Sequence, residues 1–474
     1  MRGDGPMPWA PIRDPADLPA RLATLRDGFS LETAPDAKGR RRRLDALAAA
    51  IRTRRERVLA AIRDDFGHRA EIEILTGDYG FTLDAIGHLR KHLRGWARAR
   101  RRIALQPIPG RVEVRLEPKG VVGIVSPWNY PLQLALVPLA TAIAAGNRVM
   151  LKPAERTPRT AELLAEIVHD ALPEDEAAVA LGEAEMGAAF AALPFDHLFI
   201  TGNTEVGRAV MRAAADNLTP VTLELGGKSP AIAMPDADPD RHGPAIAWGR
   251  WYGAGQTCVA CDHLWVRRGT AETWLAALMV QARGFLQGPQ APDYTDMIDE
   301  RARRRTEAMV EEARAGGAQV HALDLPPGRT GAYRPTIVLN APADCALLRE
   351  EVFGPVLPIL EYDDPDDVVA AVARGPAPLA AYAFGHDTKT ARALVLRMRS
   401  GGAAVNASIL QLALHDAPFG GVGASGMGAY HGERGFREFS HERTVFTAWS
   451  ARAVSMVAPP YAASVRRAIG WMTR

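Results

Sequence analysis

Residues 221–230 read VTLELGGKSP, and this stretch divides the chain into two series of strands and helices. Its apolar run, Val221–Leu225, is typical of a buried strand, and the glycines that follow end the strand. Short apolar runs alternate with helical patterns from about residue 121 up to this stretch, and again from about residue 230 to Val405. Strands that alternate with helices at this spacing form right-handed βαβ units around a parallel sheet. The sequence therefore predicts an α/β fold with two parallel-sheet domains.

The other elements on the N-terminal side follow from the same patterns. Residues 40–104 carry long helical patterns, and alternating apolar and charged residues at Val112–Leu116 are typical of a half-exposed strand. Thr157-Pro158 is typical of a helix start, with an N-cap residue followed by proline. Further strands are predicted at Val121–Val125, Val149–Leu151, Ala178–Leu181 and His197–Ile200, and further helices at Leu132–Ala145 and Thr204–Asn217.

The composition of the 474-residue chain is that of a globular protein with two or three packed units. Hydrophobic residues make up 47% and charged residues 24%, which excludes a disordered chain and a collagen-like fibre. Arginine clusters at 40–43, 52–57 and 98–102 are compatible with nucleic-acid binding. However, 55 acidic residues balance the 57 basic ones, and the clusters fall on helical patterns. We therefore interpret them as solvated helix faces and expect no nucleic-acid partner.

Cysteine content and apolar runs bear on the location of the protein. Three cysteines, Cys258, Cys261 and Cys345, are too few for a disulfide framework and favour a reducing compartment. Residues 1–9 contain no apolar run of the kind found in secretory signals, and the longest apolar stretch, 132–145, is too short to cross a bilayer. We expect a cytoplasmic protein with no membrane span.

The C-terminal segment 459–474 combines Tyr461, Val465, Ile469 and Trp471 with Arg466 and Arg467. Such a segment is compatible with weak contact at a membrane surface. It is also compatible with a terminal helix that packs on a partner subunit, and we favour this second interpretation.

Cys258 follows the small, flexible segment Gly253-Ala254-Gly255-Gln256-Thr257. A cysteine nucleophile needs a nearby base or positive charge, because only a few per cent of a free thiol is ionised at neutral pH. The alternative is a cysteine that acts as a small buried hydrophobe. The glycines favour a reactive thiol, because they let another backbone or a ligand approach closely.

Cys258 and Cys261 also form a Cys-x-x-Cys pair. Zinc binding would need a second pair of ligands at a suitable spacing, and the histidines and cysteines do not supply one, so we predict no metal site. A thioredoxin-like role lacks its fold context. We interpret Cys261 as a spectator, and reversible oxidation of the pair to a disulfide is an open hypothesis.

The glycine-rich stretch invites two interpretations. Gly226-Gly227-Lys228-Ser229 resembles the end of a phosphate loop, but Thr222 stands where that motif requires glycine. Glu224 ends an apolar strand, and the carboxyl ends of strands are where the sites of α/β proteins collect. It is either a general base whose pKa burial raises or a solvated glutamate.

Two other strand ends carry residues suited to a nucleotide. Residues 199–207, FITGNTEVG, join a predicted strand to a helix, and backbone N–H groups at such a helix start can face a pyrophosphate. The spacing departs from the Gly-x-Gly-x-x-Gly pattern of dinucleotide sites. Lys152 and Glu155 follow another strand, where an acidic side chain can accept hydrogen bonds from ribose hydroxyls.

Taken together and in this order, these segments resemble the aldehyde dehydrogenase superfamily over roughly residues 40 to 447. The segments that carry the resemblance are SPWNYP (126–131), LKPAE (151–155), TGNTEVG (201–207), LELGGKSP (223–230), GQTC (255–258), EEVFGP (350–355) and PFGGVG (418–423). Those most similar to the class 3-related, coniferyl aldehyde dehydrogenase branch are DFGHR (65–69), NLTP (217–220) and GMGAYHG (426–432).

The resemblance implies a mechanism for oxidising an aldehyde. Cys258 attacks the aldehyde carbon, and Asn129 and the Cys258 backbone N–H donate hydrogen bonds to the oxyanion. Losing one such donor typically costs about 2.7–4 kcal/mol of transition-state stabilisation. Transfer of hydride to NAD(P)⁺ leaves a thioester, and water activated by Glu224 hydrolyses it to the carboxylic acid. The expected substrates are aromatic aldehydes, such as coniferyl aldehyde, or medium-to-long apolar ones.

The resemblance also implies a cofactor site. Lys152 and Glu155 meet the adenosine ribose, and Glu351 holds the nicotinamide ribose. A carboxylate about 4 Å from a 2′-phosphate opposes it by roughly 4 kcal/mol at an effective dielectric constant of about 20, so Glu155 favours NAD⁺. Lys152 partly offsets this effect and leaves tolerance for NADP⁺. The residues expected at the cofactor are Ser126, Pro127, Trp128, Lys152, Glu155, Thr201, Gly202, Asn203, Gly207, Leu225, Gly226, Glu351 and Phe353.

The same resemblance divides the chain into domains. A Rossmann-type cofactor domain is expected at residues 1–110 and 121–227, and a catalytic domain at 228–410. A β bridging element at 111–120 and 436–450 would join two subunits as a homodimer, and 451–474 would form a C-terminal tail.

The chain departs from the family pattern at several positions. Asn203 stands where the family usually has serine, and Cys261 where it usually has proline. Ala407-Ser408 replaces the common Asp-Thr, and the segment Ile409–Ala417 is more apolar than the matching loop. The last two changes lie near the expected substrate tunnel, so they leave the identity of the aldehyde open without affecting the chemistry.

Two alternatives to hydrolytic aldehyde oxidation remain at this point. In a CoA-acylating dehydrogenase, CoA rather than water takes the acyl group, and the presence of Glu224 argues for water. A catalytically silent binding subunit is the other alternative, and the presence of both Cys258 and Glu224 argues against it.

Overall fold

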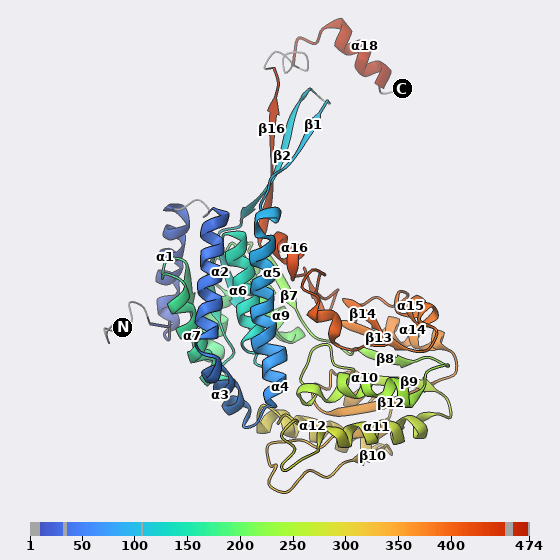
Figure 1. Ribbon diagram of the computed structural model, residues 1–474. Helices are drawn as coiled ribbons and strands as arrows, with labels where there is room; N and C mark the ends of the chain where they lie inside the picture. Colours follow the sequence, from blue (N-terminus) through green and yellow to red (C-terminus); the bar gives the residue numbers. More distant parts are fainter. Residues whose placement is uncertain (1–9, 32–35, 106–107, 451–457, 473–474) are drawn as a thin grey trace.

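The structure is a computed structural model that describes residues 10–31, 36–105, 108–450 and 458–472 (Figure 1). Two mostly parallel sheets, each covered by helices, make up the body, and a slender three-stranded antiparallel sheet projects from it. The predicted α/β class is confirmed, and so are two parallel sheets on either side of residues 225–229.

The first sheet has six strands in the order β15-β7-β6-β3-β4-β5. All adjacent pairs are parallel except β15 with β7. Its strands are β3 (Val121–Val125), β4 (Arg148–Lys152), β5 (Ala177–Val179), β6 (His197–Thr201), β7 (Val221–Glu224) and β15 (Gly426–Met427). The short β15 comes from near the C-terminus and covers the edge that β7 would otherwise expose.

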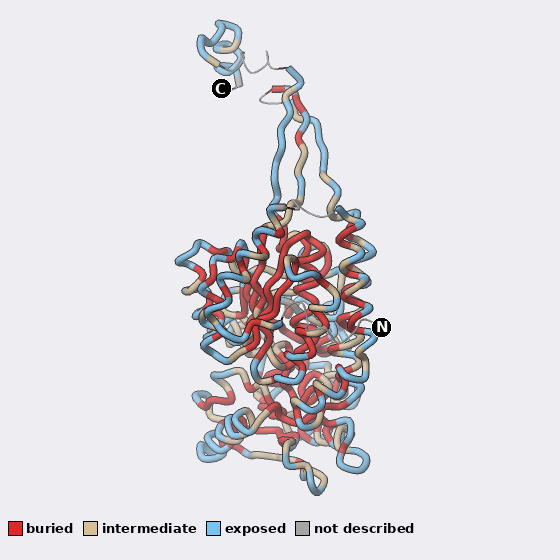
Figure 2. The backbone as a smooth tube through the Cα atoms, turned by 90° about the vertical axis from the view of Figure 1, so that its left-hand side faces the viewer, coloured by how far each residue is buried: buried red, intermediate tan, exposed pale blue. Residues whose placement is uncertain are grey.

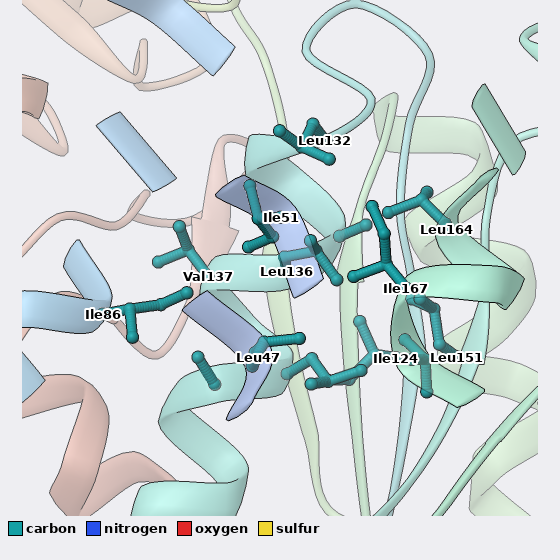
Figure 3. Close-up of a cluster of buried hydrophobic side chains, with 14 of the residues drawn as sticks. Leu47, Ile51, Ile86, Ile124, Leu132, Leu136, Val137, Leu151, Leu164 and Ile167 are labelled. Atoms are coloured by element: carbon teal, nitrogen blue, oxygen red, sulfur yellow. The ribbon is translucent and has the colours of Figure 1, made fainter. Parts of the chain in front are cut away.

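Alternate residues of these strands enter two separate cores, as expected for a sheet with helices on both faces. Val122 and Ile124 belong to the core under one set of helices, whereas Val121 belongs to the core on the opposite face. Figure 3 shows part of the first core. Its helices are α2 (Ala37–Arg52), α3 (Arg55–Phe66), α5 (Phe81–Trp96), α6 (Gln133–Ala145) and α7 (Pro158–Ala171), and those of the other face are α1 (Leu18–Leu31), α8 (Ala184–Ala191) and α9 (Thr204–Ala215).

The second sheet has seven strands in the order β10-β11-β12-β9-β8-β13-β14, and only β10 is antiparallel. Its strands are β8 (Pro230–Ala233), β9 (His263–Arg267), β10 (Gln319–Ala322), β11 (Thr336–Leu339), β12 (Val356–Tyr362), β13 (Ala380–Phe384) and β14 (Gly402–Val405). Helices α10 (Pro239–Trp251) and α11 (Ala271–Phe285) cover one face, and α12 (Glu300–Ala315), α14 (Pro365–Arg374) and α15 (Thr388–Val395) cover the other.

The projecting sheet, which we call the arm, consists of β1 (Arg100–Ala104), β2 (Gly110–Pro118) and β16 (Ser440–Ala448). Figure 2 shows that much of the arm is exposed, and the exposed helix α18 (Ala463–Met472) lies beyond its tip. The helical prediction for residues 40–104 is wrong at its end, because residues 100–104 pair with β2 instead. Pairing with a distant strand overrides the local helical pattern there.

The remaining differences from the predicted elements are small. Thr157 is the N-cap of α7, followed by proline as predicted, but its side chain makes no capping hydrogen bond. Among the described residues, no helix has the length and apolar character needed to cross a membrane.

Candidate active site

The residues expected at the cofactor lie where strands of the first sheet end. Four neighbouring parallel strands, β4, β3, β6 and β7, have their carboxyl ends at Lys152, Val125, Thr201 and Glu224. Counted along the chain, β3 to β7 lie in the order 3-2-1-4-5, so the direction of the connections reverses between β3 and β6. Open α/β sheets bind ligands at such a reversal, outside the carboxyl ends of the strands.

The segment after β3 brings Ser126, Pro127 and Trp128 to this edge of the sheet. The Ser126 hydroxyl is buried and finds no partner among the described residues. The ring of Trp128 makes an edge contact with Phe353 at 5.5 Å between centroids, and the Arg156 guanidinium lies 4.5 Å over its face. A buried hydroxyl without a partner beside fixed aromatic rings suits a ligand with polar and planar parts.

The end of β4 carries an ion pair. The Lys152 ammonium, which is buried, donates to the Glu155 carboxylate at 2.6 Å. Burial opposes ionisation of Glu155, but the hydrogen bond from Lys152, a backbone hydrogen bond and the charges of Lys152 and Arg156 together outweigh it and lower the pKa of Glu155. The Glu155 carboxylate is therefore charged at neutral pH and is available to ribose hydroxyls.

The turn from β6 into α9 has the features of a phosphate site. The Asn203 side chain caps α9 by accepting a hydrogen bond from the backbone N–H three residues on, at 2.9 Å. Gly207 lets α9 lie against β7, because a Cβ atom there would come within 2.8 Å of the Leu225 side chain. The Thr201 hydroxyl is buried and, within the described part of the chain, makes no hydrogen bond. Gly202 lies between Thr201 and the helix start, whose N–H groups favour an anion.

Gly226 makes room for the carboxylate of Glu351. A Cβ atom at Gly226 would lie 2.2 Å from a Glu351 carboxylate oxygen, so a larger residue there would displace the Glu351 carboxylate. Burial and repulsion from Asp262 raise the pKa of Glu351 to about 8. Phe353, two residues further on, has a φ of 47°, which is rare outside glycine and turns its ring toward Trp128.

Glu224 lies at the end of β7 with an unpaired carboxylate. The residue is 2% exposed, and neither carboxylate oxygen has a hydrogen-bond partner among the described residues. Burial raises the pKa of Glu224 well above its usual range, and repulsion from Glu438 adds to the rise. Buried carboxylates without partners are rare and expensive, so this one calls for a functional explanation.

Cys258 lies in a tight turn after the kink at Gly253 and Ala254, both of which have left-handed backbone angles. Burial raises the pKa of the Cys258 thiol to about 12, and the charges of Glu351 and Glu224 add to the effect. The backbone N–H groups of Cys258 and Val259 hydrogen-bond the thiol and oppose the rise. The thiol and the two carboxylates are therefore close enough to influence one another. Glu224 ends a strand of the first sheet, whereas Cys258 and Glu351 precede strands of the second.

Asn129 joins the segment after β3 to the turn that carries Cys258. Its side-chain amide donates to the Gln256 carbonyl at 3.0 Å, and its own carbonyl accepts from the Arg69 guanidinium at 2.7 Å. The next residue, Tyr130, bonds the Thr257 hydroxyl at 2.7 Å. The Asn129 amide is thus held close to Cys258, with its second N–H left for a ligand.

A buried network that was not recognised from the sequence supports this arrangement. Arg69 forms a buried ion pair with Asp78 at 3.4 Å, and Asp78 also accepts the first backbone N–H groups of the α6 turn. Asp78 lies in a π-helical segment, Ile74–Gly80, a conformation that is rare and common at functional sites. Glu73 accepts from the Gly253 N–H at 2.8 Å and so holds the kink before Cys258.

Cys261 is a free thiol, as is Cys258. It is fully buried, whereas Cys258 is half-buried. Burial raises the pKa of both thiols to about 12, so their exposure distinguishes them and their pKa does not. This surrounding suits a structural cysteine, and the disulfide stays a hypothesis.

The aldehyde dehydrogenase family model matches residues 13–445 of this chain. The chain belongs to the aldehyde dehydrogenase family. It is 41% identical to the probable coniferyl aldehyde dehydrogenase of Pseudomonas aeruginosa over 454 residues, which cover 95% of each protein. The superfamily resemblance read from the sequence and the similarity to the coniferyl aldehyde dehydrogenase branch are therefore confirmed.

Solved structures of aldehyde dehydrogenases have the same fold. The substrate-bound AldH of Staphylococcus aureus superposes with a TM-score of 0.90 at 32% identity, over 96% of this chain and 99% of that one. The Mycobacterium tuberculosis aldehyde dehydrogenase, complexed with NAD⁺, gives 0.83 at 29% identity, over 92% and 91%. The predicted aldehyde dehydrogenase-like fold is thus confirmed.

Proposed function

We propose that this aldehyde dehydrogenase oxidises an aldehyde to a carboxylic acid, with Cys258 as the nucleophile, Asn129 as an oxyanion donor and Glu224 as the base. The observation that carries the proposal is the unpaired, buried carboxylate of Glu224, which influences the Cys258 thiol electrostatically. A carboxylate with a raised pKa near a thiol is suited to taking protons at neutral pH.

Cys258 first loses its proton to solvent, and the thiolate attacks the aldehyde carbon, which becomes tetrahedral. The Asn129 amide and the Cys258 N–H stabilise the negative oxygen by hydrogen bonds that strengthen as charge develops. NAD(P)⁺ held at the strand ends would supply the hydride acceptor, and loss of hydride from this carbon would leave a thioester on Cys258. Glu224 then takes a proton from water, the hydroxide attacks the thioester carbon, and the carbon–sulfur bond breaks to release the acid.

The strand ends fit a dinucleotide. The orphan hydroxyls of Ser126 and Thr201 and the close approach at Gly207 fit its phosphate and sugar groups. Glu155, ionised and paired with Lys152, suits a ribose hydroxyl and opposes a 2′-phosphate, so we propose NAD⁺ as the preferred cofactor with tolerance for NADP⁺.

The proposed substrates are aromatic or medium-to-long apolar aldehydes. Cys258 packs against the same hydrophobic core as Trp248, Leu412 and Phe419. The relative in Pseudomonas aeruginosa is named for coniferyl aldehyde, an aromatic substrate of this class. We therefore propose an aromatic aldehyde, with coniferyl aldehyde as the first candidate.

The experiment is NADH formation across a panel of aromatic and aliphatic aldehydes, with and without CoA, and with product analysis. We expect the free acid in both cases. The Cys258→Ser variant should lose activity by about a thousandfold or more. The Glu224→Gln variant should give one rapid turnover of NADH and then a slow rate, because the thioester accumulates. Full activity of Cys258→Ser would refute the mechanism, and an acyl-CoA product would refute the hydrolytic step.

We also propose a homodimer, formed through the arm, in the cytoplasm. The arm exposes the apolar side chains of Ile103, Val445, Phe446 and Trp449. Its outer strand β16 is a nine-residue edge, and an edge of this length pairs readily with another strand.

A further inference from the structure

The hydroxyl of Tyr382 makes three hydrogen bonds next to the turn that carries Cys258. Tyr382 lies in the middle of β13 and is fully buried. Its hydroxyl donates to the Val259 carbonyl at 2.6 Å. It accepts from the Ile409 N–H at 3.3 Å and from the Gln411 side-chain amide at 2.8 Å. A hydroxyl has one donor and two acceptor sites, so the capacity of this one is fully used.

The Val259 carbonyl belongs to the peptide group that joins Val259 to Ala260. This group directly follows the backbone N–H groups of Cys258 and Val259, which hydrogen-bond the thiol. The N–H of the same peptide, on Ala260, donates to the Thr257 carbonyl at 2.9 Å. Because a peptide group is planar, bonds on both of its edges fix its orientation. Fixing this peptide limits rotation about the backbone of Val259, and so holds the Val259 N–H that hydrogen-bonds the Cys258 thiol.

On its other side, the Tyr382 hydroxyl holds a strained loop. Ile409 has a φ of 62°, an outlier for a β-branched residue, and such a conformation persists only where its surroundings hold it. The loop continues through Leu410, which is exposed, to Leu412. The Leu412 side chain packs against the core of the first sheet that contains α6 and against the core of the second sheet that contains α10. It therefore lies between the solvent and the core that contains the nucleophile turn.

We propose that Tyr382 is a positioning residue that couples the 409–413 loop to the Cys258 turn. It acts through the Val259 backbone and has no contact with the reacting atoms. When an aldehyde contacts the loop, the hydrogen bond from Tyr382 to the Val259 carbonyl changes, and with it the position of the Cys258 thiol. This inference rests on the proposed function, because it needs Cys258 as the nucleophile.

The test compares Tyr382→Phe with Tyr362→Phe in the full-length enzyme. Tyr362 lies on β12 of the same sheet, is buried, and its hydroxyl also donates to a backbone carbonyl, that of Ala233, at 2.6 Å. Each substitution removes one hydroxyl and keeps the ring, so the two have similar consequences for packing. They differ in that only the Tyr382 bond reaches the nucleophile turn.

Three quantities are measured: kcat with the best aldehyde of the panel, KM for NAD⁺, and the rate at which iodoacetamide alkylates Cys258 without cofactor. For Tyr382→Phe we expect kcat to fall about tenfold, which corresponds to one ordinary hydrogen bond, and the alkylation rate to change at least about threefold. KM for NAD⁺ should stay within about twofold. For Tyr362→Phe all three should stay within about twofold.

Gln411→Met provides a second variant in case Tyr382→Phe does not fold. It removes only the half-buried amide donor and should lower kcat about two- to threefold, with a parallel change in alkylation. If Tyr382→Phe and Tyr362→Phe had the same kcat and the same alkylation rate, the inference would be overturned. It would also be overturned if KM for NAD⁺ in Tyr382→Phe rose by the same factor as kcat fell. If Cys258→Ser remained active, the proposed function itself would fail, and that result is distinct from either.

Discussion

Glu224 is kept in the native protein at the expense of stability. Burial and repulsion from Glu438 raise its pKa in the folded state, whereas in the unfolded chain it ionises near pH 4.3. Its contribution to stability is therefore present below the unfolded pKa and is lost as the pH rises toward the folded pKa. The proposed role of Glu224 as a base accounts for this carboxylate, and such a conflict between activity and stability is common.

We predict that Glu224→Gln raises the thermal midpoint of unfolding, and that the gain is larger at pH 8 than at pH 5. The amide has the shape of the carboxyl group and does not ionise, so it escapes the penalty that grows above pH 4.3. A gain of roughly 1–3 °C at pH 8 is expected. The exposed Glu185, changed to Gln, is the control and should show no such difference between pH values. If the gain in the thermal midpoint over the wild type were smaller at pH 8 than at pH 5, the argument would be contradicted.

At the scale of elements, helix α9 and strand β7 form the phosphate side of the proposed cofactor site because a glycine lets them meet. Gly207 faces Leu225 so closely that an added methyl group would force the helix away. Gly187 in α8, a helix on the same face of the same sheet, has space for a methyl group, since the nearest atom to its Cβ would be 4.0 Å away.

We predict that Gly207→Ala raises KM for NAD⁺ by about fivefold or more, because overpacking of this kind costs about 1–3 kcal/mol and displaces the start of α9. Gly187→Ala is the matched control and should leave KM unchanged while stabilising α8 by about 0.5–1 kcal/mol. Steady-state kinetics and urea unfolding measure both effects. An unchanged KM in Gly207→Ala would show that α9 does not contact the cofactor.

The elements that the sequence predicts well are those whose signal is local. The strand ends at Lys152, Thr201 and Glu224 follow from apolar runs that stop at polar or glycine residues, and the structure gathers them at one edge. The network of Arg69 and Asp78 could not be found in this way, because its contacts join residues some fifty positions apart. A buried ion pair leaves no periodic pattern in the sequence. The segment DFGHR (65–69), which ends in Arg69, indicates only a resemblance to the family.

At the scale of the whole molecule, several arginines form ion pairs with the acidic residues of helix α7. Arg54 lies against Asp170 and Glu166, and Arg57 bonds Glu166 at 2.7 Å. Arg13 reaches Glu162 on the same helix, α7. The acidic residues of α7 thus neutralise much of the charge of the 52–57 cluster. Exposed pairs of this kind add little stability each, but they neutralise part of the positive charge of this cluster.

We predict that Val445→Glu breaks the proposed dimer and gives a monomer. Val445 is exposed on β16, the outer strand of the arm, and a buried charge at a strand interface opposes pairing. Val280→Glu is the control, since Val280 is an exposed valine on α11, away from the arm. Sedimentation velocity at micromolar concentration distinguishes the two states. A dimeric Val445→Glu protein would place the subunit contact elsewhere.

The short strand β15 has a consequence for how the chain is made. The strand that ends in Glu224 acquires its outer neighbour only from residues 426–427, which the ribosome delivers roughly 10–40 s later at ordinary rates of synthesis. During that interval β7 has an open edge, which is where nascent chains aggregate. The nascent chain therefore passes through a stage in which its proposed catalytic base lies on an unprotected strand, and a chaperone would act on this stage of biosynthesis.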